Sequence, residues 1–386
     1  MSNILIIGNG FDLYHGLPTR YSDLLFLAEN WNEFYGNYMT ATNLEENVDQ
    51  FTVRLNNGKL SIESLLDFCN HKTTFNDEHI QFLNEHLTSN HWIKYFLEFG
   101  FQGKGWVDFE AAIDDALHKI DIFFSTVPKY SNDFSESYYE KDFFEKIQYF
   151  LLLTKDKYTD FKNVHENDVQ SSMLREHKNY LISKLENELN VLNECLRLYL
   201  LEFVLKIKCD KYSKQVKSLN FNYLLNFNYT YTYRTIYGVK DTEHHPIHGD
   251  CINDNMILGI PDESFKRNLE FIHFAKYFQR ISKKSGNFYK EWIKRPDSLT
   301  CSDVPCDVYI MGHSLSVNDK GILKDFFLND WVRKITIFYH NQQAMDDLIV
   351  NLVYMFGQDY VIEQTGNNRI VFEKLNQAID KNYETI

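Results

Sequence analysis

NILIIGNGFDLYHGLPTRY, residues 3–21, begins as a short apolar run and breaks into glycines at positions 8 and 10. Such a run is typical of a buried β-strand. Glycine after the strand lets the backbone turn or approach a ligand closely, and the free N–H groups of a following helix can hold a phosphate. Nucleotides commonly bind here, at the carboxyl end of a parallel strand. The stretch therefore predicts a strand and then either a nucleotide-binding turn or a tight turn into a helix that Asp12 caps.

The last part of the chain, from about residue 218, contains further strand-like runs. Each run is short, β-branched or aromatic, and bounded by turn residues. They cover residues 224–230, 255–260, 306–312, 334–340 and 368–373. Residues 344–357 have apolar positions at helical spacing and a glycine stop, which predicts a helix. Strand, helix and strand in succession predict a parallel sheet.

Residues 21–217 have a helical pattern, most clearly over residues 108–124 and 176–207. The second stretch carries leucines at spacings of three and four, as core-facing helices do. The first strand is too short and apolar to stand alone, so we expect it to join the later strands. The sequence thus predicts an α/β fold in which residues 1–20 and 218–386 form a sheet domain and residues 21–217 a helical insertion domain. Residues 282–302 are the best loop candidate near the end.

The composition favours a folded protein with no overall affinity for nucleic acid. Hydrophobic residues make up 44 % of the 386 positions, and the net charge of −14 provides no basic field. The six cysteines contain no CxxC pair, which indicates free thiols in a reducing compartment. Zinc at Cys251, Cys301 and Cys306 with a nearby histidine is the alternative. Without a signal-like segment or a run of about 20 apolar residues, we expect a cytoplasmic protein outside the membrane.

Two further motifs place polar residues at strand ends. Asn228 lies among hydroxyl residues in LNFNYTYTY, and His248 precedes Gly249 in HHPIHGD. A histidine beside a glycine at a strand end is well placed to face a pocket and to titrate near neutrality. His244 and His245 could instead join it around a metal, but no HExxH-like frame exists and we expect no metal.

A third motif, MGHSLSVND at residues 311–319, again ends a strand in glycine. Gly312 is followed by His313, Ser314 and Ser316 in the expected turn. Three strands that end in small or polar residues predict a shared cleft, although each motif alone also fits a capped turn.

These motifs together resemble one bacterial family. Residues 6–24, IIGNGFDLYHGLPTRYSDL, are similar to the N-terminal signature of the AbiH family, proteins linked to abortive infection by phage. The other matching segments, in the family's order, are GWVDFE (105–110), NFNYT (226–230), PIHG (246–249), LGI (258–260) and GHSLSVND (312–319). The resemblance spans nearly the whole chain and implies an anti-phage protein.

A more distant resemblance is to sirtuin-like proteins, whose defence members break the bond between nicotinamide and ribose in NAD. It implies a Rossmann-like parallel sheet, NAD or NADP as substrate, and catalysis by an asparagine and a histidine. The positions that follow the sirtuin-like order are Gly8, Gly10, Gly16, Pro18, Asn228, His248, Gly249, Gly312 and Ser314. The sequence departs from that pattern at Asn9, where a small residue is usual, and at Asp12, where serine is usual. It also lacks the paired-cysteine zinc ribbon, which argues against protein deacylation.

The resemblance implies roles for individual residues. His248 would accept a proton from water or a ribose hydroxyl, Asn228 would hold that group, and Asp12 would bind ribose or polarise a neighbour. The residues implied for nucleotide binding are Gly8, Asn9, Gly10, Phe11, His15, Gly16, Pro18, Gly249, Gly312, His313 and Ser314. For Asp108 and Glu110 we expect a solvated helix start that suits the helix dipole, or alternatively a place at the cleft rim.

The predicted function is an abortive-infection NAD glycohydrolase that depletes NAD. The expected partners are a nucleotide, a phage-derived trigger and a second copy of the chain, with no nucleic acid and no membrane. One alternative is a nucleotide sensor or partner-docking module without catalysis. Another is a metal-dependent nuclease, which needs several carboxylates around a divalent ion. Its candidates are Asp12, Asp108, Asp250 and Asp319.

Overall fold

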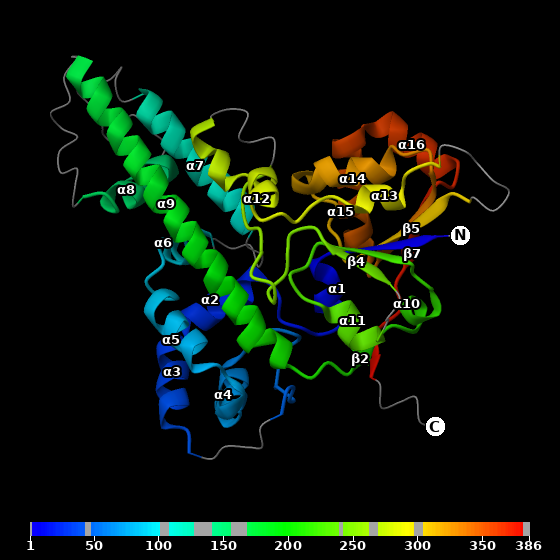
Figure 1. Cartoon of the computed structure of the whole chain (residues 1–386), viewed down its shortest axis with the longest axis horizontal. Coiled ribbons are helices and arrows are strands. Elements are labelled where there is room, and N and C mark those ends of the chain that lie inside the picture. The colour runs from blue at the N-terminus through cyan, green and yellow to red at the C-terminus, as the bar shows by residue number, and fades with distance from the viewer. Residues whose placement is uncertain are drawn as a thin grey trace.

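The fold is described by a computed structural model over residues 2–42, 48–100, 108–126, 141–155, 168–238, 242–261, 269–296 and 304–380. It contains a parallel sheet of six strands in the order β4-β3-β1-β5-β6-β7. The sheet lies in the right half of Figure 1. The strands are β1 (Asn3–Ile7), β3 (Tyr223–Asn226), β4 (Glu243–Pro246), β5 (Cys306–Met311), β6 (Val332–Tyr339) and β7 (Ile370–Lys374). Numbered in chain order, this is the 3-2-1-4-5-6 order of the Rossmann fold. The predicted α/β fold with a Rossmann-like sheet is therefore confirmed.

Strand β1 lies in the middle of the sheet because its side chains are apolar on both faces. Ile4 and Ile6 pack into one hydrophobic cluster and Leu5 and Ile7 into another, as the alternation of a strand requires. Both faces of the sheet are covered, which is why the strand has no polar positions in its interior. The backbone of β1 pairs with β3 on one side and β5 on the other.

The helical insertion follows β1, as predicted, and lies beside the sheet (Figure 1). Between β1 and β3 come α1 (Asn9–Tyr14), α2 (Tyr21–Glu29), α3 (Trp31–Thr40), α4 (Ile62–Asn70), α5 (Asp77–His86), α6 (His91–Tyr95), α7 (Phe109–Thr126), α8 (Lys141–Leu152), α9 (Asp168–Glu202) and α10 (Lys214–Ser218). Short 3₁₀ or π turns occupy Lys72–Thr74, Phe96–Gly100 and Val204–Lys206. The expected helices over residues 108–124 and 176–207 are α7 and α9, and α9 ends at Glu202. The two-domain division stays a prediction.

Helix α9 packs its leucine positions into the core of the insertion. Leu185 and Leu192 are fully buried there, among aromatic side chains from several helices. Trp92 of α6 donates its indole N–H to the carbonyl of Leu185 at 3.0 Å. The prediction that this stretch forms a core-facing helix is therefore confirmed.

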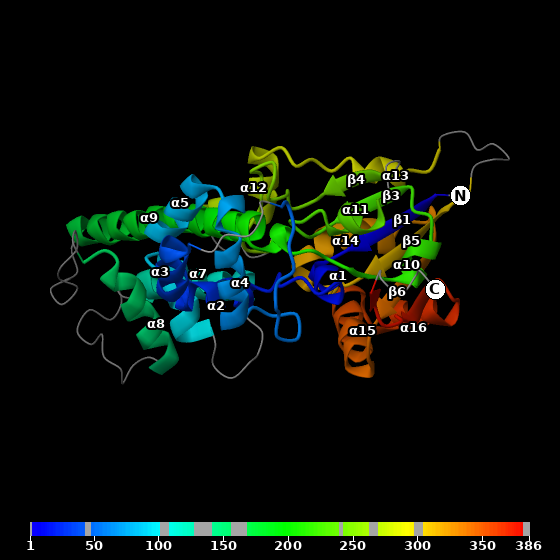
Figure 2. The same cartoon turned by 90° about the horizontal axis from the view of Figure 1, so that it is seen from below.

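The remaining helices follow β3. They are α11 (Thr232–Tyr237), the 3₁₀ turn at Leu269–Phe274, α12 (Lys276–Ser282), α13 (Tyr289–Trp292), the 3₁₀ turn at Val317–Asp319, α14 (Lys320–Phe327), α15 (Gln342–Phe356) and α16 (Gln358–Gly366). A small antiparallel pair, β2 (Lys211–Tyr212) with β8 (Ile379–Asp380), completes the elements. Figures 1 and 2 both place α12 between the helical insertion and the sheet. Helix α15 confirms the helix expected over residues 344–357.

Three expectations about the later elements were wrong in whole or in part. Residues 255–260 form no strand, because Tyr229 and other side chains bond to their carbonyl groups and only Ile260 makes an isolated bridge, to Ala275. Strand β3 stops at Asn226, whose side chain accepts from the N–H of Asn228 and so turns the chain. The described part of the loop expected over residues 282–302 contains α13, and residues 297–302 lie outside the described residues. Strand β4 was expected only as the strand that ends near His248, without bounds.

Candidate functional site

The candidate site lies at the carboxyl ends of the central strands, where the glycine-rich turn after β1 meets the turn after β5. The N–H of Gly10 donates to the carbonyl of Gly312 at 2.8 Å, and the N–H of Gly8 donates to that of Met311 at 3.2 Å. A Cβ added to Gly8 would stand 2.8 Å from the Cα of His313, and one added to Gly10 would stand 2.8 Å from the Cα of Gly312. The glycines are therefore required by the close approach of the two turns.

The start of α1 offers fewer free N–H groups than the sequence suggested. The N–H of Gly10 is bound by Gly312, and the N–H of Phe11 donates to the carbonyl of Gly8 at 2.8 Å. Helix α1 itself has only six residues. These two N–H groups already have partners inside the protein and are not open to a phosphate.

Asp12 and Asn228 form the first polar group of the site. Thr230 donates its hydroxyl to Asp12 Oδ2 at 2.6 Å. Burial raises the pKa of Asp12 to about 6, although the hydroxyls of Thr230 and Thr232 and the amide of Asn228 act against this rise. Asp12 Oδ1 and Asn228 Nδ2 are both buried, and neither makes a hydrogen bond of 3.5 Å or less to the described residues, although the amide is near enough to the carboxyl to lower its pKa. Buried polar atoms are rarely left without a hydrogen bond, so this open contact is where a bound hydroxyl would fit.

His248 lies just beyond β4 and is buried. Its Nε2 stands 3.6 Å from Asp319 Oδ1 and has no hydrogen-bond partner among the described residues. Burial and the nearby Lys276 cation hold the pKa of His248 well below its ordinary value, against the opposing effect of Asp319. The ring is therefore neutral at physiological pH.

Asp319 belongs to a buried ionic cluster with Lys276, Glu110 and His313. Lys276 Nζ lies 2.7 Å from Glu110 Oε2 and 3.4 Å from Asp319 Oδ1, and His313 Nε2 lies 3.4 Å from Asp319 Oδ2. Burial raises the pKa of Asp319, but Lys276 and the hydrogen bond from His313 outweigh burial and lower it. The pKa of Lys276 is raised, because its two carboxylate neighbours outweigh burial. Burial raises the pKa of Glu110 to about 7, although Lys276 opposes this.

Phe227 packs against both histidines of the second polar group. Its ring lies 4.3 Å from that of His313 and 5.4 Å from that of His248, measured between centroids. The next residue along the chain is Asn228. The ends of β1, β3, β4 and β5 thus bring the polar side chains to one edge of the sheet, as expected of parallel strands.

Some residues implied for nucleotide binding have other partners. The His15 ring lies between the carbonyl of Phe11, at 2.7 Å, and the hydroxyl of Tyr237, at 2.8 Å. The carbonyl of Pro18 accepts from the hydroxyl of Tyr199 in α9 at 2.6 Å. Both contacts tie the segment after α1 to its surroundings.

Other implied binding residues lie at turns or on the surface. Asn9 is exposed and accepts from the Thr19 hydroxyl at 2.6 Å, and Ser314 is exposed. Gly16 and Gly249 have φ angles of +86° and +70°, which favour glycine at both turns. The structure gathers three sets of predicted residues: Gly8, Gly10 and Gly312; Asp12 and Asn228; His248 and His313.

Lys276 was not anticipated from the sequence, and the first expectation for Glu110 was wrong. Asp108 does begin a helix, since its Oδ1 accepts from the N–H groups of Glu110 and Ala111 at 3.0 and 3.1 Å. Glu110, however, is buried against Lys276. The sequence did contain one signal: Lys276 is the only lysine in the aromatic-rich segment FIHFAKYF, residues 271–278. Residues 105–107 of the GWVDFE segment lie outside the described residues.

The carboxylates considered for a nuclease have separate partners. Asp250 Oδ1 accepts from the N–H groups of Ile252 and Asn253 at 2.9 and 2.8 Å, and Asp108 caps α7. Across the described ranges, no three His, Cys, Asp or Glu residues are grouped so as to hold a metal ion. Cys301 lies outside the described residues. Nor does the described part of the chain contain a helix long and apolar enough to cross a bilayer.

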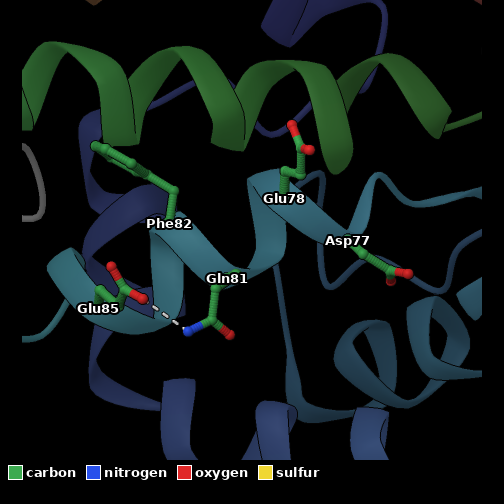
Figure 3. A pocket seen from close by; sticks show the side chains of 5 residues that line it. All are labelled: Asp77, Glu78, Gln81, Phe82 and Glu85. Atoms are coloured by element: carbon green, nitrogen blue, oxygen red, sulfur yellow. Dashed lines mark hydrogen bonds between the residues drawn. The ribbon is translucent and has the colours of Figure 1, made fainter.

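A hollow of about 500 Å³ lies elsewhere, along α5 in the helical insertion (Figure 3). Its lining residues are Asp77, Glu78, Gln81, Phe82 and Glu85. All of them belong to α5, and Gln81 donates to Glu85 at 2.7 Å. The hollow is thus an acidic surface depression and contains none of the residues predicted for the site.

Comparison with known proteins gives one finding. Residues 4–340 match the family described as Bacteriophage abortive infection AbiH. No curated protein and no solved structure matches the chain. The match begins in β1 and extends past the end of β6, so it includes every residue of the candidate site. On that match, the chain belongs to the AbiH family of bacteriophage abortive-infection proteins.

Proposed function

We propose that this AbiH protein binds a nicotinamide dinucleotide at the carboxyl edge of its sheet and hydrolyses the bond between nicotinamide and ribose during phage infection. The observation that carries the proposal is the buried pair of Asp12 and Asn228: the amide lies near enough to the carboxyl to lower its pKa, yet neither Asp12 Oδ1 nor Asn228 Nδ2 makes a hydrogen bond of 3.5 Å or less to the described residues. One atom accepts hydrogen bonds and the other donates them. A ribose hydroxyl does both, so it fits this pair.

The strand order supports a nucleotide at this edge. In open parallel sheets, ligands bind beyond the carboxyl ends of the strands, where the direction of winding reverses. Here that reversal falls between β1 and β5, beside Asp12 and His313. Because the N–H groups of Gly10 and Phe11 have internal partners, we assign the glycine turn to holding β1 against β5 rather than to the phosphates.

The proposed reaction breaks the bond from ribose C1′ to the nicotinamide nitrogen and forms a bond from C1′ to a water oxygen. Nicotinamide leaves as a neutral molecule, and the water gives up a proton. The transition state resembles an oxocarbenium ion. His248, which is neutral because burial and Lys276 lower its pKa, has a free site for that proton. Asp12 is mostly ionised above pH 6 and can accept from a ribose hydroxyl.

The test measures nicotinamide released from NAD, and separately from NADP, by the purified full chain. We expect release by the wild type and a loss of about 10²-fold or more for His248→Asn, the range for removing a general base. Asn228→Ala should raise KM, because it removes a donor to the ribose. The same assay in extract from phage-infected cells covers the predicted trigger.

The control is His177→Asn. His177 is also buried, but it lies in α9 and bonds to the hydroxyl of Thr154 at 2.6 Å. Its replacement should leave nicotinamide release unchanged. Absence of release by the wild type in both settings would contradict the hydrolase, and binding of NAD without release would favour the sensor.

A further inference from the structure

We infer that Asp319 is the positioning residue of His248, and that Lys276 and Glu110 hold Asp319 in place from the side of the helical insertion. The inference rests on the proposed function in one respect, that His248 is the base. The geometry itself is independent of the substrate. It makes the helical insertion part of the catalytic arrangement.

Asp319 is held at both of its oxygens. Oδ1 lies 3.4 Å from Lys276 Nζ, and Oδ2 lies 3.4 Å from His313 Nε2. His313 Nδ1 accepts from the N–H of Leu315 at 2.9 Å, so the proton of the neutral ring is on Nε2 and faces Asp319. The carboxylate therefore has a fixed orientation before any substrate binds.

This fixed carboxylate faces His248. The distance from Asp319 Oδ1 to His248 Nε2 is 3.6 Å, and a small movement of the ring completes the hydrogen bond. A carboxylate opposite Nε2 keeps the proton on that nitrogen, which leaves Nδ1 to take a proton from water. It also stabilises the imidazolium formed, as the third member of a nucleophile–base–carboxylate triad does.

Lys276 connects this carboxylate to the helical insertion. It is on α12, and its ammonium group also binds Glu110 in the first turn of α7. Lys276 is buried, and among the described residues its ion pairs are with these two carboxylates, so removing one of them leaves part of a buried charge uncompensated. The placement of Asp319 thus depends on where α7 and α12 lie.

The charges around His248 predict shifts of opposite sign. The groups that act on it are Lys276, Asp319, Arg280 and His313, and the Phe227 ring covers it without charge. Asp319 raises the pKa of His248 and Lys276 lowers it. Removing the carboxylate should therefore lower this pKa, and removing the ammonium group should raise it.

The experiment is a titration of the ¹⁵N-histidine-labelled full chain by NMR, with His248 assigned from His248→Gln. We expect the wild-type ring to carry its proton on Nε2. Asp319→Asn should abolish this preference. The double variant Glu110→Gln with Lys276→Met removes one charge of each sign and so keeps the formal net charge of the cluster; it should raise the His248 pKa by about one unit.

Asp307→Asn is the matched control. Asp307 is also a buried, ion-paired carboxylate, but it binds Arg333 at the opposite end of β5. It should leave the His248 tautomer and pKa unchanged. A wild-type proton on Nδ1, or the same tautomer in Asp319→Asn as in the wild type, would overturn the inference. If the NMR changes appear as expected but the protein does not hydrolyse NAD, the proposed reaction is overturned and the role of Asp319 is not.

Discussion

Gly312 determines how closely the two central strands approach at their carboxyl ends. Its φ angle is +67°, and a Cβ placed on it would lie 2.0 Å from the backbone nitrogen of Phe11. Both facts exclude a side chain, the first by strain and the second by direct overlap with backbone atoms. The contact between the turns after β1 and β5 therefore depends on Gly312 as well as on Gly8 and Gly10.

We expect Gly312→Ala to lower the free energy of unfolding by about 2 kcal/mol or more, since a left-handed backbone at a residue with a Cβ costs about 1–3 kcal/mol before any overlap. Urea denaturation measures the change. Gly366→Ala is the control, because a Cβ there meets nothing within 4 Å. Equal stability of the two variants would show that the turns are not packed as described.

Asp12 should make stability depend on pH. Its pKa is raised from 3.8 to about 6 by burial, so between these values the folded protein binds more protons than the unfolded chain. Stability then falls as the pH rises from about 4 to about 6, by up to about 3 kcal/mol from this group. Asp12→Asn removes this contribution and should be more stable relative to the wild type at pH 7 than at pH 4. The check is urea denaturation at both pH values, and an unchanged difference would refute it.

At the scale of elements, the start of α7 connects a helix cap to the ionic cluster. Asp108 Oδ1 accepts from the N–H groups of Glu110 and Ala111, and Glu110 then binds Lys276. A cap that fixes the first turn of the helix thereby also fixes the carboxylate that holds Lys276.

Asp108→Ala should therefore lower the free energy of unfolding by about 1 kcal/mol, the usual effect of removing an N-cap. Asp108→Asn retains an oxygen that can accept hydrogen bonds from the same two N–H groups. It should therefore lower the free energy of unfolding by only a small part of that roughly 1 kcal/mol. Thermal or urea denaturation of both variants measures the difference. An equal loss in the two would show that the charge of Asp108, and not its capping, is what matters.

The elements differ in how well the sequence predicts them. The runs that form β1, β5, β6 and β7 are apolar or β-branched and are buried in the sheet, so the prediction of strands there is confirmed. Residues 255–260 have the same composition, yet side chains from α9, α12 and the turn after β3 satisfy their carbonyl groups. The periodicity of a sequence shows which positions are apolar, but it does not show which groups form hydrogen bonds with the backbone. It therefore could not distinguish residues 255–260 from the runs that form strands.

The residues of the candidate site also differ in how well the sequence predicts them. Asp12 and Asn228 follow apolar strands, and His248 lies just after β4. Because the ends of parallel strands meet at one edge, local patterns were enough to predict that these three side chains lie at that edge. The Glu110–Lys276 contact joins α7 to α12, which lie far apart in the sequence. A lysine among aromatic residues and a glutamate at a helix start each fit an ordinary solvated position, and only the packing of the insertion against the sheet joins them.

At the scale of the whole molecule, the insertion separates β1 from both strands that pair with it. During synthesis β1 leaves the ribosome first, and β3 is made more than two hundred residues later. At 5–20 residues per second, roughly 10–40 s pass before the first partner strand is made. During that time the helices of the insertion can fold, but the sheet edge that carries the candidate site does not exist. A nascent chain thus lacks the candidate site until β5 and the turn that carries Asp319 have been synthesised, so the activity proposed for the protein cannot appear in a partly made chain.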